Sequence, residues 1–212
     1  MKWMLFLVVS LFLCSALPAC VVEQGEEEES FSSLPAQEEE VGESADELSS
    51  CVVSGVLWGA WYSQNNPSWK SVLLGKSASQ TIGGAGCVIT SLAMAYNDVW
   101  GKPTTPAEFN TSAKSAGCFG SGSALVDVSC AINSRGGPHT VSDISMSSVP
   151  TALCAGRPVM VDVTWGGGHK MLVYRYNGGN STSLSSYEAV DPWTGASKFL
   201  TGYTATRWRE LK

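Results

Sequence analysis

The sequence contains only two histidines, His139 and His169, and none of its seven cysteines stands two to four residues from another. Structural zinc sites combine four Cys or His side chains, usually with two cysteines at such a short spacing. The chain therefore lacks the pattern of a zinc site. We expect neither a metal nor an organic cofactor.

Basic residues are also few. Thirteen Lys and Arg stand against nineteen Asp and Glu, so the whole chain carries a net charge of −6. Eleven of the acids fall between residues 21 and 50, and from residue 51 onward twelve basic residues face eight acids, a net charge of +4. No basic helix and no dense run of alternating aromatic and basic residues occurs. This composition argues against nucleic-acid binding.

Three segments differ in composition. Residues 1–19 join a positive start, an apolar run and a small-residue end, which is the pattern of an export signal. Residues 20–50 are too acidic to bury enough apolar surface for folding, so we expect a disordered tether. Residues 51–212 are long enough for one folded domain, which we expect to be monomeric.

The end of the export signal allows two kinds of processing. Leu17-Pro18-Ala19-Cys20 resembles a bacterial lipobox, in which the cysteine is lipidated and becomes the mature N-terminus. Proline before the alanine departs from that pattern, so ordinary cleavage after Ala19 is the alternative. We expect an exported protein, either a lipoprotein of the cell envelope or a secreted one. A lipid on Cys20 would be its only attachment to a membrane.

Export also bears on the cysteines, because oxidising compartments favour disulfides. If Cys20 carries lipid and Cys87 stays free, four cysteines remain for two disulfides in one of three connectivities: Cys51, Cys118, Cys130 and Cys154. If Cys20 is not lipidated, six cysteines remain. That even number weakens the case for a free thiol.

The sequence pattern of the folded segment predicts helices first and strands afterwards. Apolar spacing and capping residues predict helices over 86–99, from Thr105-Pro106, over 123–134 and over 149–155. Alternating and β-branched residues predict strands over 158–164, 171–176, 186–190, 197–200 and 206–211, with 51–64 as an extended lead-in. Helices first and an antiparallel run of strands afterwards indicate the α+β class.

One cysteine stands out. Cys87 follows the glycine-rich run Gly83-Gly84-Ala85-Gly86 and begins the first predicted helix. The first turn of a helix presents unpaired N–H groups and a partial positive charge, and both favour the thiolate, which is the nucleophilic form. A buried, chemically inert cysteine or half of a disulfide is the alternative.

Three further residues complete a candidate catalytic set. His169, between three glycines and an apolar strand, is the candidate base and is favoured over His139, which lies beside a weaker strand. Asp191 would orient the imidazole, and Gln64 would donate to the developing oxyanion together with the N–H of Cys87. Each of these residues taken singly is also an ordinary turn or loop residue.

Taken in order, these motifs resemble a known family. Gln64, Trp69, Gly86-Cys87, Gly168-His169 and Asp191-Pro192-Trp193 resemble papain-like cysteine peptidases related to the bacteriocin-processing (double-glycine) peptidases, in their stand-alone exported bacterial form. The resemblance implies a helical half that carries the nucleophile, packed on an antiparallel sheet that carries His169 and Asp191. Lys170 departs from the family, where an aliphatic or aromatic residue usually follows the histidine.

The function expected on these grounds is an exported thiol hydrolase that cleaves a peptide or protein substrate through an acyl-enzyme. Gly86, Trp165, Gly168 and Trp193 are the candidate substrate-binding residues, although both tryptophans would equally suit a core. Two alternatives stay open. One is a cell-wall amidase or transpeptidase that uses the same triad, and the other is a catalytically inert binding module.

Overall fold

The computed structural model describes residues 50–52, 61–122, 127–136 and 138–212. The predicted export signal, the lipidation candidate Cys20 and all of the predicted tether except Ser50 lie outside the described residues. The described part is an α+β structure with one antiparallel sheet, as the order of helical and strand patterns predicted.

The sheet forms one half of this structure. In the described part of the chain, strands pair antiparallel in the order β2-β7-β3-β4-β5-β6, and β1 pairs with β4. The strands are β1 (Cys51–Val52), β2 (Val141–Ile144), β3 (Val159–Val163), β4 (His169–Tyr176), β5 (Tyr187–Asp191), β6 (Ala196–Phe199) and β7 (Ala205–Leu211).

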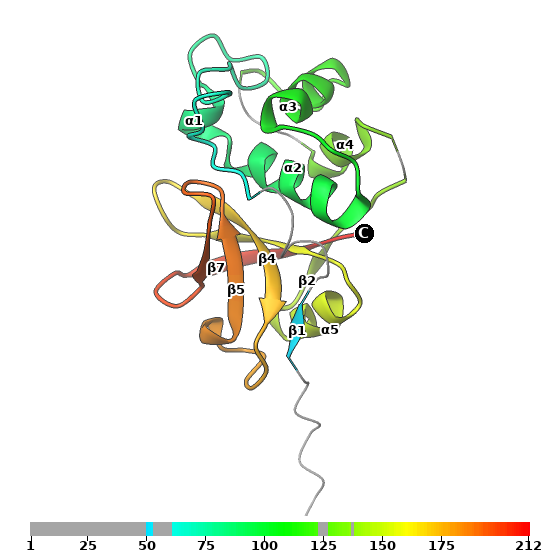
Figure 1. The fold of residues 1–212 in the computed structure, drawn as a ribbon, viewed down its shortest axis with the longest axis vertical. Coiled ribbons are helices and arrows are strands. Elements are labelled where there is room, and N and C mark those ends of the chain that lie inside the picture. Colours follow the sequence, from blue (N-terminus) through cyan, green and yellow to red (C-terminus); the bar gives the residue numbers. More distant parts are fainter. Residues whose placement is uncertain (1–49, 53–60, 123–126, 137) are drawn as a thin grey trace, which may run out of the picture. The chain divides into compact units, whose positions relative to one another are not determined.

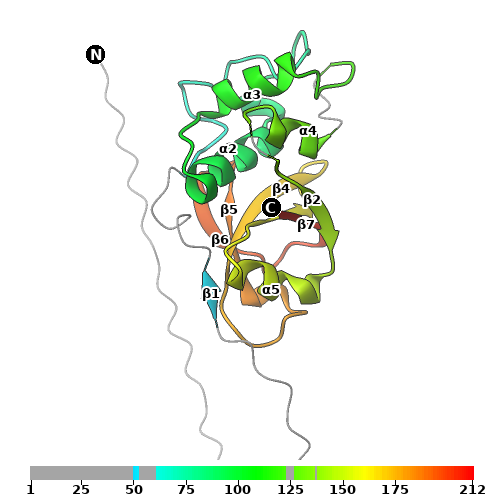
Figure 2. The same cartoon turned by 90° about the vertical axis from the view of Figure 1, so that its right-hand side faces the viewer.

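The helices form the other half. They are α1 (Ile82–Ala85), α2 (Cys87–Trp100), α3 (Pro106–Ser115), α4 (Val128–Asn133) and α5 (Val149–Cys154), with 3₁₀ turns at Met146–Ser148 and Leu184–Ser186. Figures 1 and 2 show α1 to α4 gathered on one side of the sheet, whereas α5 lies beside β1. Helix α2 packs against β4, and Ile89, Leu92 and Met94 are almost completely buried. The core therefore lies along this contact between helix and sheet.

Local sequence explains most of these boundaries. Thr105 accepts from the N–H of Glu108, and the Glu108 carboxylate accepts in return from the N–H of Thr105, so the predicted capping box begins α3. Helix α2 ends at Gly101, which takes a left-handed conformation with φ of 59°. Strand β2 was not predicted, because Ser142 and Asp143 have low strand propensity. It forms through antiparallel pairing with β7.

Two disulfides are present. Cys51–Cys154 joins β1 to the end of α5, with 5.0 Å between Cα atoms, and Cys118–Cys130 joins the segment after α3 to α4, with 5.5 Å. Cys87 is the only free cysteine in the described ranges. The predicted use of four cysteines in disulfides is confirmed, and the structure selects one of the three connectivities that the sequence left open.

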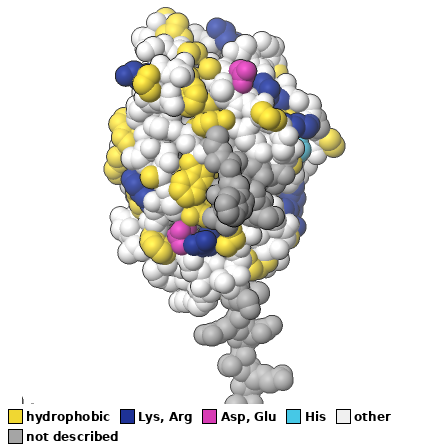
Figure 3. All heavy atoms as spheres, viewed as in Figure 1, with side chains coloured by type: hydrophobic (Ala, Val, Ile, Leu, Met, Phe, Trp, Pro, Cys, Tyr) yellow, Lys and Arg dark blue, Asp and Glu magenta, His cyan; other side chains and the backbone are white. Residues whose placement is uncertain are grey.

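Figure 3 shows one face of the molecule. On the face in Figure 3, hydrophobic side chains lie in small groups among polar atoms, and Lys and Arg are spread over several parts. Within the described ranges, no helix combines the length and hydrophobicity that crossing a bilayer requires.

The two disulfides should differ in their contribution to stability. Cys51–Cys154 spans 103 residues and Cys118–Cys130 spans 12. Chain-entropy arguments give about 4.7 kcal/mol for a loop of roughly 100 residues and about 3 kcal/mol for a short one. We expect the double variant Cys51→Ser/Cys154→Ser to lower the Tm by more degrees than Cys118→Ser/Cys130→Ser in thermal unfolding followed by circular dichroism. An equal or reversed order would contradict this expectation.

Candidate active site

Cys87 is the first residue of α2, and a short preceding helix places it there. Thr81 caps α1 by accepting from the N–H of Gly84, and Gly86 is both the end of α1 and the cap of α2. A Cβ on Gly86 would lie 2.5 Å from the carbonyl oxygen of Ile82, so only glycine allows this tight junction. The Cys87 thiol is half-buried at the positive end of the 14-residue helix.

His169 and Asp191 meet on neighbouring strands. His169 begins β4 and Asp191 ends β5, and the Nε2 of His169 lies 2.7 Å from Oδ1 of Asp191. The N–H of Trp193 donates to the same carboxylate oxygen at 2.8 Å. Only 4% of His169 and 2% of Asp191 is exposed to solvent. Their hydrogen bond is therefore shielded from water, and Asp191 holds the ring in one orientation.

The imidazole also reaches across to the helix. The imidazole of His169 interacts with the thiol of Cys87, and since Nε2 faces Asp191, Nδ1 is the nitrogen left for the sulfur. Burial raises the pKa of the Cys87 thiol, but the hydrogen bond and charge of His169 and the backbone N–H of Lys170 lower it more. The net result is a thiol pKa below its ordinary value, which favours the thiolate.

The pKa values of His169 and Asp191 move in opposite directions. Burial lowers the pKa of His169, but the hydrogen bonds to Asp191 and Cys87 outweigh it and raise the pKa to about 9. Burial raises the pKa of Asp191, while His169 and Lys198 lower it to about 2. Near neutral pH these pKa values favour an imidazolium beside a carboxylate, and the lowered pKa of Cys87 shifts the thiol toward the thiolate.

Lys198 is a site residue that the sequence analysis missed. Its Nζ donates to Oδ2 of Asp191 at 2.6 Å, so the carboxylate has a cation on each side. The register explains the contact: Ala189 pairs with Lys198 and Asp191 with Ala196, so Asp191 and Lys198 are diagonal neighbours on one face. The hairpin of β5 and β6 could have indicated this pair, had its turn length been known.

Gln64 lies in the same site and is held there by the loop after β5. The N–H of Gln64 donates to the carbonyl of Pro192 at 2.6 Å, and its Nε2 donates to the carbonyl of Gly83 at 2.9 Å. Gly195 packs close to Ser63, where a Cβ would lie 2.9 Å from the backbone nitrogen. One N–H of the Gln64 amide is therefore used within the fold, and the amide carries a second N–H.

A cleft of about 360 Å³ contains these groups. Its walls include Gln64, Cys87 and His169, together with the two tryptophans. The Trp165 ring packs edge-on against His169 at 5.0 Å and lies 5.6 Å from Trp193. Trp165 is 45% exposed and Trp193 is 40% exposed, so they line the cleft instead of filling the core.

The two candidate glycines have different positions. Gly168 lines the cleft and ends the run Gly166-Gly167-Gly168, in which all three φ angles are positive, at 56°, 89° and 109°. Other residues rarely adopt such a backbone, so this loop requires glycine. Gly86 is buried beneath the cleft, where it packs against Ile82, and the neighbouring Gly84 and Ala85 form the lining.

His139 is far from these groups. Its ring stacks on Trp100 at 3.9 Å, at the opposite end of α2 from Cys87. Thirteen residues of helix at 1.5 Å each separate the two ends by about 20 Å. The structure thus brings together Cys87, His169, Asp191 and Gln64, and it leaves His139 out.

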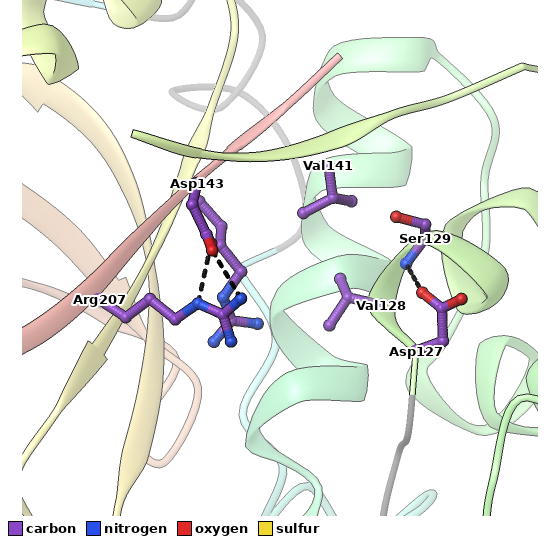
Figure 4. Close-up of a pocket in the computed structure, with 7 residues that line it drawn as sticks. Asp127, Val128, Ser129, Val141, Asp143 and Arg207 are labelled. Atoms are coloured by element: carbon purple, nitrogen blue, oxygen red, sulfur yellow. Dashed lines mark hydrogen bonds and ion pairs between the residues drawn. The ribbon is translucent and has the colours of Figure 1, made fainter. Parts of the chain in front are cut away.

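A second recess of about 210 Å³ lies between α4, β2 and β7, and Figure 4 shows its residues. Its charged groups are used within the fold: Arg207 makes two 2.8 Å hydrogen bonds to Asp143, and Asp127 caps α4 through the N–H of Ser129. Val128 and Val141 face each other across it. Among the described residues, no three His, Cys, Asp or Glu side chains gather as metal ligands would.

No protein-family model, curated protein or solved structure matches the chain. The chemical interpretation of the site therefore depends on its own geometry. That geometry is a free thiol at a helix start, an imidazole that interacts with it, and a carboxylate held between His169 and Lys198.

From the contact of Lys198 with Asp191 we predict how Lys198 affects the pKa of His169. Asp191 and Cys87, the two titratable groups that raise the pKa of this ring, stay unchanged in the variant. Lys198→Met removes a cation that offsets the Asp191 charge, so the imidazolium should become more favourable and the pKa of His169 should rise. Lys198→Arg should retain the wild-type value. Ring signals in NMR titrations measure this, with His139→Gln to assign the two histidines. An unchanged pKa in Lys198→Met would count against the role of Lys198.

Proposed function

We propose that this chain is an exported cysteine peptidase of the papain-like type, related to the bacteriocin-processing peptidases, which hydrolyses a peptide amide bond. The supporting observation is that His169, which is hydrogen-bonded to Asp191 and interacts with Cys87, lines an open cleft together with Cys87. The order of the motifs along the chain adds to this support. Export follows from the sequence pattern of residues 1–19.

In the proposed acylation step, the Cys87 sulfur attacks the carbonyl carbon of the scissile amide. The carbonyl oxygen becomes negative and accepts hydrogen bonds from the Gln64 amide and from the N–H of Cys87. The His169 imidazolium then gives its Nδ1 proton to the amide nitrogen. The C–N bond breaks, the amine leaves, and a thioester on Cys87 remains.

The proposed deacylation step uses the now neutral imidazole as a base. His169 takes a proton from water, the hydroxyl attacks the thioester, and the C–S bond breaks to release a carboxylic acid and the Cys87 thiolate. The proton that His169 took from water leaves it as an imidazolium, which again pairs with the Cys87 thiolate. Asp191 keeps the ring in position through both steps because its carboxylate is bound by His169, Lys198 and the N–H of Trp193.

The alternative of an inert binding module receives less support. An inert cysteine in an oxidising compartment tends to be paired, yet Cys87 is free while four other cysteines pair. A binding module also has no need for a buried imidazole between a thiol and a carboxylate. Burying ionisable groups has a free-energy cost that a catalytic role explains.

Replacing the nucleophile tests the proposal directly. Cys87→Ala should abolish peptide hydrolysis and the labelling of residues 51–212 by iodoacetamide, because the other cysteines of that segment are in disulfides. Cys87→Ser keeps the shape of the site and should lose at least about 10³-fold in kcat. Activity is measured on a fluorescence-quenched peptide library, with non-reducing mass spectrometry to check the disulfides. Hydrolysis at the wild-type rate by Cys87→Ala would refute the proposal.

Gln64 should act on the oxyanion and not on the thiol. Removing one oxyanion donor costs about 10²- to 10³-fold in kcat, so Gln64→Ala should show that loss with little change in KM. The alkylation rate of Cys87 by iodoacetamide should stay near the wild-type value, because that reaction forms no oxyanion. A parallel fall of both rates would show instead that Gln64 acts by holding the Gly83 turn in place.

A further inference from the structure

Another recess, separate from the one between α4, β2 and β7, also includes Cys87 in its lining. It has a volume of about 250 Å³ and shares Cys87, Ala85 and Gly168 with the catalytic cleft. Neither Gln64 nor His169 lines it. Its other walls are mainly apolar side chains, and they come from Leu74, Val88, Ile89 and Phe119. We call this the apolar recess.

His169 lines the catalytic cleft but not the apolar recess. This difference indicates which half of a substrate each of them would bind. This step rests on the proposed function. The leaving amine must receive its proton from His169, so it lies in the cleft that His169 lines. The acyl half, which stays bound to Cys87, then extends toward the apolar recess. The recess is therefore placed to select residues on the acyl side of the scissile bond.

Lys170 supplies the only positive charge among the residues that line the apolar recess. Its Nζ lies 3.8 Å from Oδ2 of Asp162, which is a loose pairing, and Arg209 binds the other oxygen of the same carboxylate. Two cations thus share one carboxylate, and the charge of Lys170 is only partly neutralised. About a quarter of the Lys170 side chain (26%) is exposed, so a ligand can reach it.

From this combination we infer that the apolar recess binds the acyl half of a peptide that carries an apolar side chain next to a carboxylate, with the carboxylate paired to Lys170. The volume equals that of about eight water molecules in the liquid, which is room for an aliphatic side chain and adjoining backbone. The apolar walls bind the side chain. The ammonium at the edge binds the anion and rejects a cation at that position.

The carboxylate could belong to either of two chemical sources. One is the side chain of Glu or Asp in a linear peptide. The other is the free α-carboxylate of a glutamyl residue linked through its γ-carboxyl group. Both present the same anion to Lys170, and matched substrates of the two kinds distinguish them.

The experiment compares quenched peptides that differ at one acyl-side residue, Glu, Gln or Lys, beside a fixed leucine, and includes a γ-linked glutamyl version. In the wild-type protein, kcat/KM for the preferred carboxylate peptide should exceed that for Gln by about fivefold, the upper range for a partly exposed ion pair. The preference should weaken at high salt. In Lys170→Glu the order should reverse in favour of the Lys peptide.

Ratios of kcat/KM between peptides separate the recognition of the substrate from the reactivity of the Cys87 thiolate. Lys170 also lies near the sulfur, so Lys170→Glu should slow every substrate, but a general effect on the thiolate cancels in the ratio. Lys114→Glu is the matched control, because it makes the same change in net charge at an exposed position on α3 and should retain the wild-type ratios. Val88→Phe, which fills part of the recess, should reduce the preference for leucine over alanine.

The outcomes separate this inference from the proposed function. If no peptide of any kind is hydrolysed, the proposed function fails. If peptides are hydrolysed but neither carboxylate version, linear or γ-linked, reacts faster than the Gln and Lys versions, or Lys170→Glu leaves their order unchanged, the inference is overturned and the peptidase stands. A preference that either carboxylate source shows and Lys170→Glu reverses supports the inference.

Discussion

The contact of the Cys87 sulfur with the imidazole of His169 is the interaction on which the other features of the site depend. It joins the start of α2 to the start of β4, so it exists only if helix and sheet pack in one relative position. A buried imidazolium is costly in free energy unless charged or polar partners surround it. Asp191 is such a partner on the far nitrogen, at 2.7 Å. The tight Gly86 junction and the turn after Asp191 both serve to hold these partners in reach.

The charges of the site alternate in sign. When Cys87 is ionised, its thiolate, the His169 imidazolium, the Asp191 carboxylate and the Lys198 ammonium follow one another. Each group stabilises the charged form of its neighbours, which explains why the pKa of His169 rises to about 9 while that of Asp191 falls to about 2. Lys198 moderates this series because it competes with His169 for the carboxylate. A second lysine, Lys170, lies near the sulfur, so cations are found at both ends.

The surroundings of the sulfur are asymmetric. The side that His169 lines is polar and carries Gln64 and two exposed tryptophans, whereas the other side is mainly apolar with Lys170 at its edge. An amide hydrolase needs such a difference, because the leaving amine requires a proton and the acyl group requires only binding. The disulfides lie outside this centre and connect strand β1 with α5 and the end of α3 with α4. They stabilise the halves that carry the site while leaving its one free thiol available.

Local sequence determined several parts of this protein by itself. The glycine run before Cys87 and the Thr105–Glu108 capping box indicated where two helices begin, because helix starts depend on residues within four positions. Chain order and residue chemistry also singled out His169 over His139. Tertiary structure alone decided the remainder: the pairing of four cysteines, the formation of β2 against β7 and the approach of Lys198 to Asp191. Each of these contacts depends on the sheet register or on packing between segments that are distant in the sequence. A local sequence pattern encodes neither of these.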